Sequence, residues 1–120
     1  MVGTGNGAVK VILGFDDSKP EFIAETTSKA HDSYHERHAI EMGLNLKQWK
    51  KAAADLLNDV EKEQYLDWYE PGRGVFRRYD VVSKRLAAGT EEGTINTYFI
   101  MSAAKLKFYL PNEYLELFNK

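Results

Sequence analysis

The sequence predicts an α+β fold in which N-terminal helices pack on a twisted antiparallel sheet of about four strands, followed by a short C-terminal helix. Three observations carry this prediction. Apolar residues recur at helical spacing between residues 32 and 58, the period changes to two from residue 75 to residue 101, and glycine-containing turns separate the alternating segments. The chain has 120 residues, 43% of them hydrophobic. We therefore expect one domain over residues 9–120, preceded by a flexible glycine-rich leader at residues 1–8.

The first half of the chain predicts a strand and then helices. The β-branched run Val9–Phe15 is typical of a strand, and Pro20 opens a polar stretch that tolerates a helix. Asp32 or Ser33 can cap a helix that ends at Gly43. Asn45 then caps a second helix, whose apolar face consists of Leu46, Trp49, Ala53, Leu56 and Leu57.

The second half predicts an antiparallel meander. Residues 60–69 fit either a helix or a strand, because EKEQ favours helix whereas QYLDWY alternates and is aromatic. A turn at Pro71–Gly74 leads into strands over residues 75–79, 81–88 and 94–101, the last two joined by a turn at Thr90–Gly93. Pro111 begins a final amphipathic helix.

Composition and charge exclude several functional classes. The chain has no cysteine, which excludes disulfides, thiolate chemistry and cysteine zinc sites. Its net charge of −2 differs from that of a general nucleic-acid coat, so any site for a polyanion must be local. No segment approaches the roughly 18–20 apolar residues that cross a bilayer, and the start of the chain lacks the regions of a secretion signal. We expect a soluble domain that does not contact a membrane.

All three histidines of the chain fall within residues 31–38 of the first predicted helix. His31 and His35 share one stripe of that helix, and His38 lies on the neighbouring, half-apolar stripe with Arg37 beside it. An imidazole near a guanidinium can handle protons and anions at neutral pH.

Three interpretations of this cluster remain open. The histidines could bind a metal with Asp32 or Glu41, although the HExxH pattern is absent. His38, Arg37 and His35 could instead supply metal-free acid–base catalysis on an RNA phosphodiester. In the third interpretation they are surface residues without a catalytic role.

A basic stripe is the second candidate feature. Between Arg73 and Arg85 the chain has four arginines and one lysine against a single acid, Asp80. Arg77 and Arg78 are neighbours on a strand, so they should point to opposite faces of the sheet. The stripe predicts an RNA-binding surface with residues Arg77, Arg78, Tyr79, Lys84 and Arg85, and Tyr98 nearby. Alternatively, these charges guard a solvated edge strand.

Short motifs in this chain resemble those of a known family. The motifs are RHAxxMG at residues 37–43, a helix with WxxxAxxL, a basic strand ending in YD at residues 79–80, and GTINTYF at residues 93–99. Over about residues 31–118 they resemble the catalytic domain of colicin D and related toxin domains among the barnase/EndoU/colicin/RelE-like ribonucleases. In colicin D two lysines precede the catalytic histidine, at the positions of His35 and Arg37, so the exchanged residues keep an anion-binding role.

The resemblance implies a site and a function. His38 matches the catalytic histidine, and Thr97 with Phe99 or Tyr98 matches the late-strand residues that flank the scissile phosphate. It implies cleavage of tRNA by attack of the 2′-hydroxyl, leaving a cyclic phosphate, without metal or cofactor.

It also implies a biological context. Such a toxin domain is secreted, or delivered from the cell surface, as part of a larger protein and acts in the cytoplasm of the target cell. A cognate immunity protein protects the producer, and the need for a translation factor is left open. The alternative is a non-enzymatic binding protein, such as an immunity protein or a small adaptor.

Overall fold

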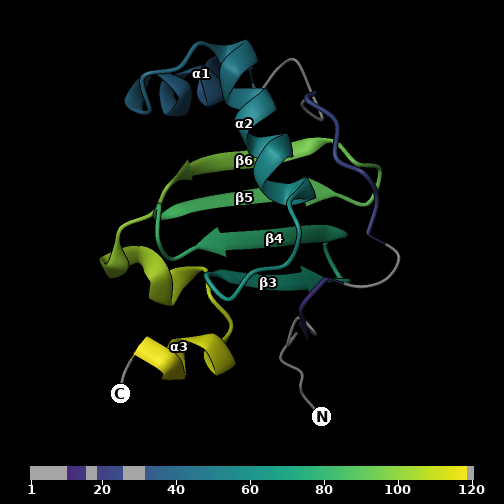
Figure 1. Cartoon of the computed structure of the whole chain (residues 1–120), viewed down its shortest axis with the longest axis vertical. Coiled ribbons are helices and arrows are strands. Elements are labelled where there is room, and N and C mark those ends of the chain that lie inside the picture. The colour runs from purple at the N-terminus through teal and green to yellow at the C-terminus, as the bar shows by residue number, and fades with distance from the viewer. Residues whose placement is uncertain (1–10, 16–18, 26–31, 119–120) are drawn as a thin grey trace.

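The computed structural model describes residues 11–15, 19–25 and 32–118, and the predicted leader lies outside them. The elements follow in chain order: β2 (Ile12–Leu13), α1 (Asp32–Glu41), α2 (Leu46–Asn58), β3 (Tyr65–Glu70), β4 (Val75–Asp80), β5 (Arg85–Thr90), β6 (Ile95–Ile100), the 3₁₀ helix η2 (Ala103–Phe108) and α3 (Asn112–Phe118). In Figure 1, α2 crosses the face of the sheet, α1 lies beyond β6, and α3 lies on the side of β3. Within the described chain, no helix is long and apolar enough to cross a membrane.

The predicted fold class is wrong in its sheet. The described residues form a five-stranded antiparallel sheet in the order β2-β3-β4-β5-β6, accompanied by a few short helices, instead of helices on four strands. Residues 65–70, which fitted either helix or strand, form β3 because every residue of this segment pairs with β4, from Tyr65 opposite Asp80 to Glu70 opposite Val75. Pairing with β4 therefore makes the YLDWYE segment a strand, whereas EKEQ at residues 61–64 lies in the connection before it.

Two further expectations fail locally. The stretch after Pro20 forms no helix over residues 19–25, and Ile23 donates its N–H to the carbonyl of Gly93 at 2.7 Å. The strand predicted to begin at Val81 begins at Arg85, because the Asp80 carboxylate accepts the backbone N–H of Val82 at 2.9 Å and the chain turns there.

One face of the sheet packs under α1 and α2. Trp49, Ala53 and Leu57 of α2 are buried there, together with Phe22 and other apolar residues of the sheet and α1. A Cβ atom built on Gly89 would lie 2.3 Å from the Phe22 ring, so only glycine lets this ring lie on β5. The members of this core are Phe22, Ala39, Trp49, Ala53, Ala54, Leu57, Phe76, Ala87, Ile95 and Tyr98.

The opposite face packs against the C-terminal segment. Met101 and Leu110, which flank η2, are buried, and the Tyr114 hydroxyl of α3 donates to the carbonyl of Asp67 at 2.7 Å. The strand residues of this core are Leu66, Trp68, Tyr79 and Leu86. The sheet is thus covered on both faces, and its β6 edge is the place where α1 meets the last strand.

Candidate active site at the β6 edge

Helix α1 holds two histidines at the edge of the sheet. Its fully buried Ala39 brings the helix backbone close to the core. The helix ends as predicted, with Gly43 at φ +73° and the N–H of Leu44 bound to the carbonyl of Ala39 at 2.9 Å. This seating fixes the direction of the side chains on the last turn of α1.

His38 stacks on Phe99 of β6. The ring centroids are 5.4 Å apart with an interplanar angle of 28°, and the His38 side chain is 19% exposed. Glu41 Oε2 lies 3.7 Å from His38 Nδ1. The imidazole is therefore held in a defined orientation and still reaches solvent.

His35 belongs to the core. It is 3% exposed and stacks on Trp49, with ring centroids 4.7 Å apart. Trp49 Nε1 donates to the carbonyl of Tyr98 at 2.8 Å, which joins α2 to β6. This burial does not favour the predicted contact of His35 with the phosphate, and the position of His35 is that of a residue that orients α1 against α2.

The other predicted residues of β6 divide between its two faces. Tyr98 is 8% exposed and points toward Trp49. Burial raises the pKa of the Tyr98 hydroxyl, and the neighbouring Arg85 guanidinium opposes this shift. Thr97 is half-buried and lies on the same face of the strand as Phe99, because side chains two residues apart point the same way.

Two of the predicted site cations, Arg37 and Lys84, are exposed. Arg37 precedes His38 on α1. Lys84 lies in the turn before β5, at φ +60°, beside the half-buried Arg85, whose guanidinium donates to the carbonyl of Ser83 at 2.9 Å. The structure thus brings His38 of α1 onto Phe99 of β6, with Thr97 on the same face of that strand. Arg85 pairs with Ile100, so its side chain lies on the other face of the sheet, beside Tyr98.

Strand pairing engages the part of the predicted basic stripe that lies on β4. Arg77 and Arg78 point to opposite faces as predicted, and each meets an acid of β3. Arg77 Nε lies 2.6 Å from Glu70, and Arg78 Nε lies 2.7 Å from Asp67. Tyr79 is 2% exposed, with its hydroxyl 3.3 Å from the carbonyl of Met101. Direct RNA contact by Arg78 and Tyr79 is therefore excluded by burial, and Arg77, 13% exposed, is engaged by Glu70.

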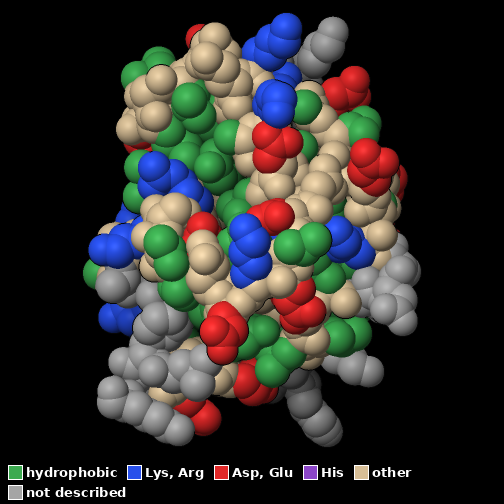
Figure 2. Space-filling model, viewed as in Figure 1, with side chains coloured by type: hydrophobic (Ala, Val, Ile, Leu, Met, Phe, Trp, Pro, Cys, Tyr) green, Lys and Arg blue, Asp and Glu red, His purple; other side chains and the backbone are tan. Residues whose placement is uncertain are grey.

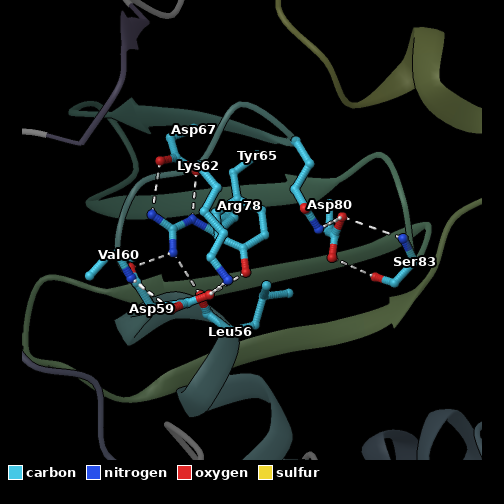
Figure 3. Close-up of polar contacts among 10 residues, drawn as sticks. Leu56, Asp59, Val60, Lys62, Tyr65, Asp67, Arg78, Asp80 and Ser83 are labelled. Atoms are coloured by element: carbon cyan, nitrogen blue, oxygen red, sulfur yellow. Dashed lines mark hydrogen bonds and ion pairs between the residues drawn. The ribbon is translucent and has the colours of Figure 1, made fainter.

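Arg78 is a structural residue that the sequence interpretation missed. Its guanidinium bonds both oxygens of Asp67, at 2.7 and 2.9 Å, and the carbonyls of Leu56 and Asp59, each at 2.8 Å (Figure 3). It therefore binds the C-terminal end of α2 to the sheet. The available signal was the Pro71–Gly74 turn, which sets Asp67 opposite Arg78 once residues 65–70 are taken as a strand.

A cavity of about 500 Å³ lies above this ion pair. Lys19 lines it, and burial lowers the pKa of this amine, with Arg78 acting in the same direction. Asp59, Glu61 and Asp67 line the same cavity. The mixed charges, and the engagement of Arg78 by four acceptor contacts, indicate a structural role for this region.

In the described part of the chain, no three His, Cys, Asp or Glu side chains lie close enough together to hold a metal ion. His31, which the metal interpretation needs, lies outside the described residues.

Comparisons with known proteins add no relative. No family model matches the chain, and neither a curated protein nor a solved structure is significantly similar to it. The resemblance to colicin D consequently rests on the short motifs alone. Any function must be argued from the site.

Proposed function

We propose that this chain is a metal-independent endoribonuclease that cleaves tRNA through attack of the ribose 2′-hydroxyl. The observation that carries the proposal is the stacking of His38 on Phe99, with ring centroids 5.4 Å apart and the His38 side chain 19% exposed. Histidine is the side chain suited to proton transfer near neutral pH, and a fixed ring orientation is what such a transfer needs.

The residues fit the chemistry of a phosphodiester transfer. In the proposed reaction His38 takes the proton of the 2′-hydroxyl while the 2′-oxygen attacks phosphorus. The bond to the 5′-oxygen breaks, and that oxygen leaves with a proton from the imidazolium or from water, so the product ends in a cyclic phosphate. Arg37, which precedes His38 on α1, supplies positive charge for the pentavalent phosphorane, and the Thr97 hydroxyl is a further donor.

The biological context follows from the motif resemblance. The proposed domain is an antibacterial toxin that is delivered as part of a larger protein and acts in the cytoplasm of a target cell. A cognate immunity protein would cover the β6 edge, and a translation factor remains a candidate activator. The alternative of a binding protein required the strand arginines to contact a partner, and Arg77 and Arg78 are occupied by Glu70 and Asp67.

The test is incubation of the purified chain with total tRNA, with and without EDTA. We expect cleavage in both conditions and products lighter by one water than linear phosphates. His38→Gln should lower the single-turnover rate by about 10²–10⁴-fold, with little change in melting temperature. Glu36→Gln, an exposed change on the same helix, is the control.

Two results would contradict the proposal. A His38→Gln chain that cleaves at the parent rate would remove His38 from the chemistry. Cleavage that EDTA abolishes, and that added Mg²⁺ restores, would show a metal-dependent enzyme.

A further inference from the structure

Helix η2 exposes several side chains between two buried residues that anchor its ends. Met101 before η2 is fully buried and Leu110 after it is 5% exposed, so both ends are anchored in the core. The intervening exposed residues include Lys105, Lys107, Phe108 and Tyr109, which we call the η2 surface. Its residues are held by a packed framework, so they offer a preformed binding surface.

The Phe108 ring is exposed and does not pack in either hydrophobic core. At 73% it is the most exposed large hydrophobic side chain in the described part of the chain. Lys107 Nζ lies 5.3 Å from the centroid of its ring, and Tyr109 is 41% exposed. An exposed aromatic ring beside a cation is the combination that stacks a nucleobase and holds its phosphate.

The η2 surface is continuous with the candidate active site. The Tyr109 ring meets the Phe99 ring edge-on at 5.6 Å, and Phe99 in turn stacks on His38 at 5.4 Å. A row of rings therefore leads from η2 to the imidazole. Figure 2 shows Lys and Arg side chains gathered along the left edge of the view, where Figure 1 places the start of β5 and η2.

From this arrangement we infer that the η2 surface binds unpaired nucleotides of the RNA that flank the scissile phosphate. Phe108 stacks on a base, and Lys105 and Lys107 pair with backbone phosphates. The inference rests on the proposed ribonuclease function and extends it by naming single-stranded RNA as the form that the site takes. Stacking accepts any base, so this subsite contributes affinity without sequence preference.

The test separates binding from cleavage. His38→Gln chains are titrated with a fluorescent, unstructured oligoribonucleotide and with an abasic oligomer of the same length. Phe108→Ser should weaken binding of the first by about 5- to 100-fold and leave binding of the abasic oligomer unchanged. Val60→Ser, which changes a 70% exposed side chain in the loop after α2, is the matched control. Lys107→Gln should lower the log–log salt slope by about 0.7, the value for one phosphate contact on a single strand.

Each outcome bears on one claim. Equal affinities for Phe108→Ser and Val60→Ser, or no oligonucleotide binding at low salt, would overturn the inference. The same holds if a protein partner binds this surface and RNA does not compete. Cleavage by the parent chain is measured in parallel. RNA binding that depends on Phe108, without any cleavage, contradicts the proposed enzyme and leaves the η2 surface as an RNA site. Cleavage together with RNA binding that does not depend on Phe108 supports the enzyme and contradicts the η2 surface as an RNA site.

Discussion

Replacement of Arg78 by methionine should destabilise the protein strongly. Its position on a basic strand predicted a role in RNA binding, whereas its contacts indicate a structural role. The Arg78 side chain is 2% exposed, and its partner Asp67 is 5% exposed. Arg78→Met would leave that carboxylate buried without its cation and would remove the donors to the carbonyls of Leu56 and Asp59. Breaking a buried pair from one side costs about 3–5 kcal/mol, a large fraction of the roughly 5–15 kcal/mol that stabilises a domain.

Urea unfolding followed by circular dichroism measures this cost. With a slope of about 2 kcal/mol per molar urea, the midpoint should fall by about 2 M. Arg73→Met is the matched control, because the Arg73 side chain is 63% exposed and its Nε lies 3.7 Å from Glu70. Such a surface pair contributes at most about 1 kcal/mol. Equal midpoints for the two variants would refute the reasoning, and a loss of RNA affinity at unchanged stability would return Arg78 to the binding surface.

Two other changes test the framework around the site. Trp49→Phe keeps a ring for the stack with His35 but removes the donor to the Tyr98 carbonyl, so the free energy of unfolding in urea should fall by about 1–3 kcal/mol; a loss near zero would show that the carbonyl finds another donor. Hydrogen bonds from Tyr65 and then Lys62 lower the pKa of Asp59 from 3.8 to about 2. The folded-state pKa lies below the unfolded value, so this stabilisation is present above pH 4 and is lost as the pH falls toward 2. Asp59→Asn should flatten the acid-unfolding curve in that window, and parallel curves for variant and parent would contradict the assignment.

The parts of the fold that depend on local chemistry could be predicted from the sequence. Asn45 and Gln48 form the capping box of α2, with bonds of 2.8 and 2.9 Å. The apolar spacing placed Trp49, Ala53 and Leu57 on the buried face. Two of the three tight turns of the meander, those that the sequence predicted, contain a glycine at positive φ, at Gly74 and Gly93, whereas the turn between β4 and β5 has Lys84 at φ +60°. In each case the cause and its effect lie within a few residues of one another.

The parts that depend on how strands pair and how helices pack could not. Residues 65–70 read ambiguously because their strand character comes from β4. The sequence indicated that Arg77 and Arg78 face opposite ways, yet it did not reveal that β3 places an acid beside each of them. Similarly, the spacing put His35 and His38 on adjacent stripes of one helix, and only the packing of α1 decides which imidazole is buried against Trp49.

Strand pairing also changes where RNA should run on this protein. A run of basic residues in a sequence becomes a basic surface only where the fold leaves the charges unmatched, and the β4 arginines are matched by Glu70 and Asp67. Exposed cations toward the β6 side of the sheet include Lys84 in the turn before β5, and Lys105 and Lys107 in η2. A phosphate backbone follows unmatched charge, because counterions are released only there. The proposed RNA path therefore follows η2 and the β6 edge toward His38 and does not cross β4.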